Sequence, residues 1–319
     1  MKTKILSTLI LLLFCHKGFS QKDTCKVGVY INRIYDFKLD DKSFMADFWI
    51  WMNYKNDSLD FEKKHDITDS KSTEFSHYTK EKKSGINWAT QKCKAQIMQQ
   101  WEVADFPFDE QKLHLIIEDA ENDTSQLIYI ADEHNSKLDS CCISNEWDVE
   151  SFTIKNKIKT YATTYGNPLL SGSSSYPLVV AEISIKRNHS WLLLLKLLTG
   201  AYVAFLISSL VFFVSSKNQD SRFGLCVGGL FAAISNKYIA ESVVPTSNTT
   251  TLIDNVHNLT FGFILLIVII SIITLKLYQS GDTRKYALSL KIDRIGFWAV
   301  LISYVLLNVM LVIMALYHV

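Results

Sequence analysis

The sequence has 319 residues, of which 48% are hydrophobic, and a formal net charge of +1. A nucleic-acid-binding protein would carry a strong basic surplus, so this balance argues against that class. The charges are distributed unevenly: residues 21–189 contain 21 Lys and Arg against 27 Asp and Glu, whereas residues 190–319 contain 9 against 5. A polar half is thus followed by an apolar half, which excludes a purely soluble protein and a disordered one.

The N-terminus has the pattern of a secretory signal peptide over residues 1–20. Two lysines precede an apolar run from Ile5 to Cys15, and Gly18-Phe19-Ser20 brings small residues before a cleavage point. The apolar run is too short to cross a hydrocarbon core of about 30 Å. We therefore expect the mature chain to begin at Gln21 and residues 21–189 to be exported.

The exported part contains four cysteines, and an oxidising compartment permits disulfides among them. The adjacent Cys141 and Cys142 either bond to each other, with strained geometry, or pair with Cys25 or Cys93. No CxxC motif or suitable histidine spacing supports a zinc site, so we expect no metal. No GxSxG, HExxH or Gly-rich phosphate loop is present either, so we expect neither an enzyme nor a cofactor.

Residues 26–57 alternate between apolar and polar side chains, and this period of two favours β-strands. A helical period appears only weakly, from Trp88 to Trp101, and the charge run Lys80–Lys83 is typical of a solvated turn. Many short strands in an exported segment predict an all-β, immunoglobulin-like sandwich over residues 21–189. Further strand-like runs are Leu113–Glu118, Gln126–Ala131, Val149–Ile158 and Leu178–Ile185.

The second half contains four apolar segments, each long enough to cross a bilayer. We expect an all-α transmembrane domain over residues 190–319 with four helices. These helices are expected at 191–214, 223–244, 259–277 and 295–317.

The basic residues between these segments predict the orientation in the membrane. Lys217 and Arg222 lie between the first two segments, whereas the loop from Val243 to Asn258 has no Lys or Arg. The positive-inside rule then places the first group in the cytoplasm and that loop outside, together with the exported N-terminal domain and the C-terminus. We expect a multi-pass protein of the inner or plasma membrane. A second cytoplasmic group surrounds the third connection: Lys276, Arg284, Lys285, Lys291 and Arg294.

The second apolar segment carries small and polar residues that a helix surrounded by lipid would not tolerate. Asp220, Gly224, Gly228 and Ser235 recur at steps of four and seven, so they share one face of a helix. One interpretation is a face turned towards water. The other is a helix-packing face of the small-xxx-small kind, formed by Gly224 and Gly228.

Four segments resemble one known family in the expected order. Phe106-Pro107-Phe108-Asp109-Glu110-Gln111 is similar to the signature loop of the pentameric ligand-gated ion channels, the Cys-loop receptor superfamily. Leu39-Asp40-Asp41-Lys42 resembles the first inter-strand loop of the bacterial members, and residues 147–152 resemble their ninth strand. Arg222 and Pro245, 23 residues apart, match the basic residue and proline that bracket the pore helix. The resemblance covers essentially the whole mature chain.

The chain departs from that family at the two cysteines that give the superfamily its name. Gln99 and Leu113 occupy their places, so the resemblance is to the prokaryotic type without this disulfide. The aromatic box that binds amine agonists in the family is also incomplete. Part of a ligand cage is expected from three tyrosines that flank the capping loop, although they equally fit ordinary strand and loop positions: Tyr161, Tyr165 and Tyr176.

The resemblance implies that five copies of the second helix surround an ion path. Asp220 would then form a ring of carboxylates at the cytoplasmic mouth, which attracts cations. Phe231 and Tyr238 would form apolar collars that gate by dewetting, and Glu241 would lie near the outer mouth. The implied pore-lining set is Asp220, Gly224, Gly228, Phe231, Ser235, Tyr238 and Glu241.

The resemblance also implies how the two halves communicate at the membrane boundary. Asp109 is expected to pair with Arg187, just before the first span, as a partly buried ion pair. The implied coupling set is Asp41, Lys42, Phe106, Pro107, Asp109, Arg187, Pro245 and Thr246.

From these features we expect a subunit of a homopentameric channel, gated by a small molecule or by protons and selective for cations. Its partners are four further copies of itself, membrane lipids, the agonist and the permeating ions. The alternative is a non-conducting receptor or scaffold that binds a ligand through its β-sandwich, with the stripe on the second span serving as a packing face.

Overall fold

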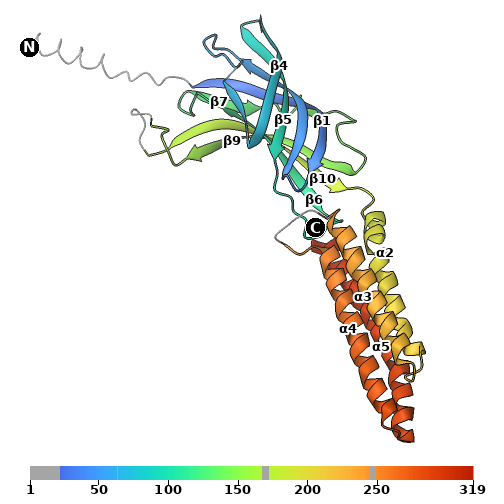
Figure 1. The fold of residues 1–319 in the computed structure, drawn as a ribbon. Helices are drawn as coiled ribbons and strands as arrows, with labels where there is room; N and C mark the ends of the chain where they lie inside the picture. The colour runs from blue at the N-terminus through green and yellow to red at the C-terminus, as the bar shows by residue number, and fades with distance from the viewer. Residues whose placement is uncertain (1–21, 63, 167–171, 245–248, 319) are drawn as a thin grey trace, which may run out of the picture.

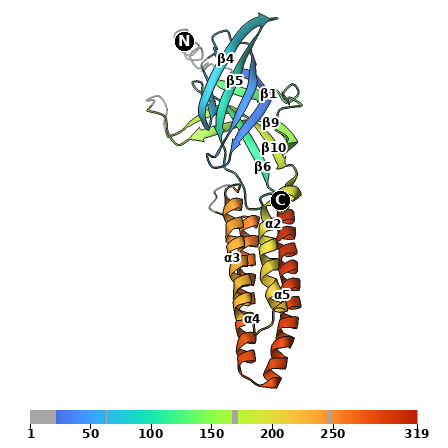
Figure 2. The same ribbon diagram turned by 45° about the vertical axis from the view of Figure 1, so that its right-hand side comes forward.

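The computed structural model describes residues 22–62, 64–166, 172–244 and 249–318. A β-domain is followed by a bundle of long helices that extends away from it, and the C-terminus lies where the two parts meet (Figures 1 and 2). The predicted order of a β-rich half and a half with four apolar helices is confirmed.

The β-domain consists of two sheets. The four-stranded sheet has the order β3-β6-β10-β9, and the six-stranded sheet has the order β4-β5-β2-β1-β7, with β8 also paired to β1. The strands span Asp23–Lys38 (β1), Ser43–Tyr54 (β2), His65–Thr68 (β3), Ser70–Lys83 (β4), Ile86–Met98 (β5), Glu110–Asp119 (β6), Leu127–Ala131 (β7), Lys137–Leu138 (β8), Trp147–Tyr161 (β9) and Ser174–Arg187 (β10).

The two sheets share one hydrophobic core. Along β2 every second side chain is buried, as the period of a strand requires. Phe48 and Ile50 of this strand belong to the same buried cluster as Val179 and Ile183 of β10, in the other sheet. The sheets therefore pack face to face, and the alternation that predicted the strands is the alternation that fills the core.

Two local predictions in this domain are wrong. The segment from Trp88 to Trp101 forms strand β5 and the residues after it, because Ala89, Cys93 and Ala95 point inwards on alternate positions between β2 and β4. Lys80–Lys83 is the exposed end of β4 rather than a turn. The turn follows at Ser84-Gly85, where both residues have positive φ angles.

The cysteines of the β-domain are free thiols. Cys25, Cys93 and Cys142 are buried, whereas Cys141 is exposed. Cys25 lies opposite Tyr54 on β2, and Cys93 of β5 lies opposite Phe48, so these two core cysteines occupy different levels of the sheet. None of the disulfide pairings left open by the sequence is formed.

The second half contains four helices long and apolar enough to cross a membrane. They are α2 (Ser190–Ser209, continued by the 3-10 helix η1 over Leu210–Phe213), α3 (Gln219–Glu241), α4 (Leu252–Gln279) and α5 (Thr283–His318). The start of α4 is defined by a capping box in which Thr251 and Asp254 bond each other's backbone N–H groups. The chain turns from α4 to α5 at Gly281, which has a positive φ angle.

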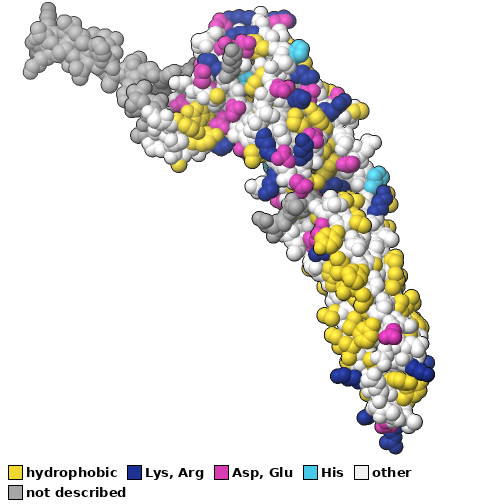
Figure 3. All heavy atoms as spheres, viewed as in Figure 1, with side chains coloured by type: hydrophobic (Ala, Val, Ile, Leu, Met, Phe, Trp, Pro, Cys, Tyr) yellow, Lys and Arg dark blue, Asp and Glu magenta, His cyan; other side chains and the backbone are white. Residues whose placement is uncertain are grey.

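Three helices extend beyond the apolar segments that the sequence indicates. The longest extension is that of α5, which begins at Thr283, three turns before its apolar stretch. Apolar composition marks only the part of a helix that suits lipid, and these first turns are charged. Figure 3 shows hydrophobic side chains over the bundle surface and basic side chains gathered at the end farthest from the β-domain.

The thiols provide a test of the sandwich core. Burial raises the pKa of Cys93 to about 12 and that of Cys25 well above its ordinary value. Because the thiolate is the reactive form, both should resist a maleimide in the native protein while Cys141 reacts. Timed labelling without reductant, followed by peptide mass spectrometry, measures this. Protection of Cys141 until a reductant is added would contradict the free-thiol structure.

Candidate functional site

Helix α3 exposes a continuous stripe along its whole length. The side chains of Phe231 and Tyr238 are 66% and 70% exposed, although both are large and hydrophobic. The other positions of the stripe are exposed as well, and they include two acidic residues. All seven residues that the resemblance implies for an ion path are on this face: Asp220, Gly224, Gly228, Phe231, Ser235, Tyr238 and Glu241.

The opposite face of α3 packs against the other helices. Cys226, Gly229 and Ala233 are buried there. Gly229 lies so close to Ser208 and the Ala204 carbonyl of α2 that a Cβ atom would collide with them. By contrast, a Cβ atom on Gly224 or Gly228 would meet nothing within 4 Å. Within this chain the close helix contact is therefore made by Gly229, and the Gly224-xxx-Gly228 pair is not part of it.

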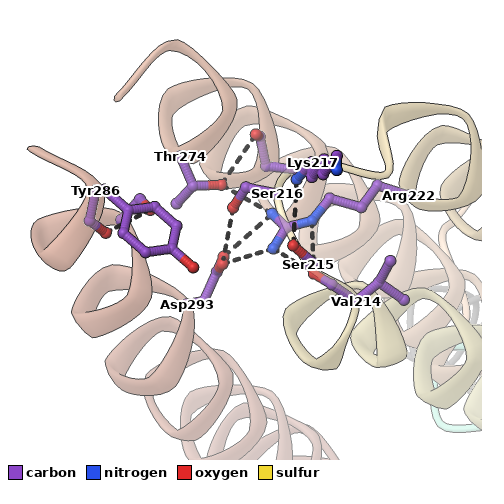
Figure 4. Close-up of polar contacts among 10 residues, drawn as sticks. Val214, Ser215, Ser216, Lys217, Arg222, Thr274, Tyr286 and Asp293 are labelled. Atoms are coloured by element: carbon purple, nitrogen blue, oxygen red, sulfur yellow. Dashed lines mark hydrogen bonds and ion pairs between the residues drawn. The ribbon is translucent and has the colours of Figure 1, made fainter. Parts of the chain in front are cut away.

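Arg222 fixes the foot of α3 to three other segments. Its side chain is 2% exposed, and its guanidinium donates to the Val214 carbonyl from Nε at 2.9 Å and from Nη2 at 2.6 Å. Nη1 donates to the Thr274 hydroxyl of α4 at 2.8 Å and to Asp293 of α5 at 3.2 Å. Nη2 completes a bidentate pair with Asp293 at 2.5 Å (Figure 4).

These contacts use every hydrogen that the guanidinium carries, because arginine has five N–H donors and each has an acceptor here. Ser216 adds a further hydrogen bond to Asp293 at 3.4 Å. We call Arg222, Asp293, Thr274 and the Val214 carbonyl the foot cluster. Asp220 lies two positions before Arg222 on the exposed face, so the cluster determines the direction in which Asp220 points.

The foot cluster predicts a large loss of stability when either charge is removed. Arg222→Gln or Asp293→Asn leaves a buried partner unpaired, which costs about 3–5 kcal/mol in comparable sites. The midpoint of thermal unfolding in detergent should fall clearly for each variant, and Lys217→Gln in the adjacent exposed loop should leave it nearly unchanged.

The double variant separates a specific pair from general damage. Arg222→Gln with Asp293→Asn should lose much less than the sum of the two single losses, since both members of the pair are gone. Equal midpoints for wild type and both single variants, or a strictly additive double variant, would contradict the cluster.

A second ion pair lies at the end of β10, where the chain leaves the β-domain for the first helix. Asp109 accepts hydrogen bonds from Nε and Nη2 of Arg187 at 2.9 and 3.2 Å, and the two side chains are 1% and 9% exposed. The Arg187 guanidinium also lies over the rings of Phe106 and Trp147, at 4.8 and 4.2 Å from their centroids. Arg187 is the last residue of β10 and α2 begins at Ser190, so this pair holds Asp109 beside the connection from the β-domain to the bundle.

The loop of residues 99–109, between β5 and β6, inserts into the end of the helix bundle. Phe106 and Phe108 belong to a buried cluster that includes residues of all four helices, such as Leu198 of α2 and Ala240 of α3. The Leu252 N–H at the start of α4 donates to the Ala104 carbonyl of this loop at 3.0 Å. The peptide bond from Phe106 to Pro107 is cis. A displacement of this loop would therefore reach every helix.

The remaining coupling residues are partly described. Asp41 accepts hydrogen bonds from Lys71 at 2.6 Å and from Ser43 at 3.1 Å, and the Lys71 ammonium lowers the pKa of this carboxyl. Lys42 has a positive φ angle in the same β1–β2 turn, and its carbonyl accepts from the Gln99 N–H at the start of the 99–109 loop. Pro245 and Thr246 lie outside the described residues.

The three tyrosines predicted to flank the capping loop meet in space. The ring centroids of Tyr161, Tyr165 and Tyr176 are 5.8, 6.0 and 6.3 Å apart, each pair edge to face. The Tyr161 hydroxyl donates to Glu118 at 2.8 Å, and burial together with this bond raises its pKa. The Lys159 ammonium lies 5.0 Å from the centroid of the Tyr161 ring. The result is an aromatic cluster beside a carboxylate at the β9–β10 end.

Across residues 22–62, 64–166, 172–244 and 249–318, no group of three or more His, Cys, Asp or Glu side chains lies close enough to hold a metal ion. Comparison with protein-family models and with curated proteins finds no match to this chain.

Proposed function

We propose that the chain is a subunit of a homopentameric, cation-selective channel of the pentameric ligand-gated type. In this proposal the β-domain is an exported, immunoglobulin-like sandwich that receives a small molecule or protons. The helix α3 of each copy lines the ion path, and the passage of ions is passive diffusion without chemistry.

The exposed stripe of α3 is the observation that carries the proposal. Asp220, Ser235 and Glu241 on a helix of a membrane bundle are costly to expose to lipid, so they need a watery path or a protein surface beside them. The helices of a single chain leave this stripe uncovered. Several copies that turn their stripes towards a common axis would cover it, and the number five follows from the resemblance to the channel family.

The positions along the stripe suggest the selectivity and the gate. Asp220 lies in the first turn of α3, so five copies would place a ring of carboxylates at the end farthest from the β-domain. Phe231 and Tyr238 would form two apolar rings nearer the β-domain, of the kind that close a pore by dewetting. Gly224 and Gly228 leave the path between them wide.

The contacts at the membrane boundary supply a route for gating. A ligand that favours one position of the 99–109 loop would bias the whole bundle, because Phe106 and Phe108 pack into the end of it. The ion pair of Asp109 and Arg187 would keep the loop and α2 moving together. In this proposal Asp41 and Lys42 act from the neighbouring turn, and Pro245 and Thr246 act from the connection of α3 and α4.

The tyrosine cluster is our candidate for the agonist site. Aromatic faces beside the Glu118 carboxylate suit a cationic ligand. Protons are the second candidate agonist, since burial raises the pKa of Asp119, which is next to Glu118 in the sequence. In the proposed orientation this site faces the exterior, and the charged end of the bundle and the Asp220 ring face the cytoplasm.

Current measurements across membranes containing the purified protein test the proposal. In a sodium chloride gradient, with pH stepped from about 8 to about 4 to titrate carboxyl groups, we expect a reversal potential near that of sodium. Asp220→Asn, which removes the ring charge without changing its shape, should shift that potential towards zero. Asp282→Asn, in the turn between α4 and α5 and off the stripe, is the matched control and should not.

A wild-type protein that carries no current because its ligand is missing would leave the proposal undecided. A variant of the apolar Phe231 ring resolves that case. Phe231→Ser should wet the constriction and produce a standing sodium current without agonist. If this variant is also silent while the protein is present and folded in the membrane, the channel proposal fails. The non-conducting receptor then becomes the better account.

A further inference from the structure

A buried polar contact joins α2, α3 and α4 near the β-domain. His257 of α4 is fully buried, and its Nδ1 lies 2.8 Å from the Ile253 carbonyl in the preceding turn. Its Nε2 lies 3.1 Å from Oδ1 of Asn236 on α3. The same Oδ1 accepts a hydrogen bond from the backbone N–H of Ala201 on α2 at 2.9 Å.

The hydrogen-bond roles in this contact depend on the protonation of the imidazole. A carbonyl only accepts, so the contact with Ile253 is a hydrogen bond when Nδ1 carries a hydrogen and donates it. In the neutral ring Nε2 then has no hydrogen, and it would face Oδ1 of Asn236 as acceptor against acceptor. In the protonated ring Nε2 donates to Oδ1, and Oδ1 accepts from both His257 and Ala201.

The neutral ring has two alternatives. A hydrogen on Nε2 donates to Oδ1 of Asn236, but the bare Nδ1 then faces the Ile253 carbonyl as acceptor against acceptor. In the other alternative the hydrogen stays on Nδ1 and the Asn236 amide turns over. Its NH2 group then donates to Nε2, but the same group faces the Ala201 N–H, and the hydrogen bond to α2 is lost. Asn236 lies directly against Gly200, where a Cβ atom would collide with it, so α2 and α3 also pack closely at this point. Only the protonated ring therefore donates to both Ile253 and Asn236 while Asn236 also accepts from Ala201 of α2.

The charged groups around the ring are few. Lys237 and Glu241 of α3 pair with each other at 3.6 Å, and Asp254 of α4 is held in the capping box with Thr251. The only charged residue of α2, Lys196, is exposed, and α5 has no charged residue after Arg294. Among these groups, the imidazole is the one whose ordinary pKa lies nearest neutral pH.

We propose that His257 is a proton-binding site within the helix bundle, and that its protonation closes a three-helix link through Asn236. Uptake of one proton completes all three hydrogen bonds, which tie the outer half of α3 to α2 and α4 together, and its release breaks one of them. Since Ser235 and Tyr238 of the stripe flank Asn236, the link would set the outer end of the ion path. That consequence rests on the proposed function, whereas the proton site itself does not.

Nuclear magnetic resonance of the full chain, with nitrogen-15 in its histidines and in lipid nanodiscs, tests the site directly. His257→Gln identifies the signals of His257. Between about pH 4 and about pH 9, a range that spans histidine titration, both ring nitrogens should be protonated at the acid end. At the basic end the ring should become neutral, with a hydrogen on one ring nitrogen only. A wild-type ring that stays in one state throughout would overturn the proposal.

Two variants at Asn236 test the role of its oxygen. Asn236→Asp has nearly the same shape and supplies a carboxylate that accepts from both neighbours, so the titration should move to higher pH by about one unit or more. Asn236→Leu removes the acceptor, so the titration should move to lower pH. Asn258→Asp adds the same charge on the exposed side of α4, beside His257, and should shift the titration far less. Equal shifts from Asn236→Asp and Asn258→Asp would overturn the link.

Currents from the same variants separate this inference from the channel proposal. If the protein conducts, the pH at half-maximal current should move in Asn236→Asp in the same direction as the titration. If every variant is silent while the titration behaves as expected, the channel proposal fails and the proton site stands. If currents flow and the ring does not titrate, the proton site fails and the channel stands.

Discussion

A helix that crosses a membrane cannot leave charged and hydroxyl side chains against lipid, and α3 carries them in one stripe along its length. Hydrocarbon offers these groups no hydrogen bonds, so something else must lie beside them. The contacts of α3 with the other helices hold it in one rotation about its own axis. Its apolar and small face is turned inwards, and its polar stripe is turned away from the other three helices.

Two separate sets of contacts hold α3 in that rotation. At one end the N–H groups of Arg222 donate hydrogen bonds to α4, to α5 and to the linker before α3. At the other end Asn236 contacts α2 and α4, and the 99–109 loop of the β-domain packs against Ala240. In the channel that we propose, a change at the end near the 99–109 loop would turn the stripe and so link the β-domain to the ion path.

The parts of this architecture that depend on local patterns are predictable from the sequence. Long apolar runs predict the four helices, and the alternation in residues 26–57 predicts the first strands, because both patterns repeat over many residues. The spacing of Asp220, Gly224, Gly228 and Ser235 likewise predicts a shared face. The prediction for the segment from Trp88 to Trp101 is wrong because its small buried residues, such as Ala89 and Ala95, give only a weak hydrophobic period. Pairing with β2 and β4 makes this segment a strand.

The contacts that hold α3 are of another kind and do not follow from local pattern. Arg222 and Asp293 are 71 positions apart, and nothing in either neighbourhood marks them as partners. Asn236 and His257 are polar residues in apolar segments, which signals a buried role, but the pairing depends on how the helices cross. Tertiary packing determines such contacts.

Water accessibility along α3 in the membrane-embedded protein tests the central claim most directly, and it needs no agonist. With the exposed Cys141 and the buried Cys226 replaced by alanine, single cysteines are placed at Ser235 and Gly228 on the stripe and at Leu230. Leu230 lies on another side of α3, and the single chain leaves 39% of it exposed. A charged, membrane-impermeant thiol reagent should modify the two stripe positions and spare Leu230, which would lie against lipid or a neighbouring copy. Modification of Leu230 with protection of the stripe would mean that the stripe is a packing face, and the account would be wrong.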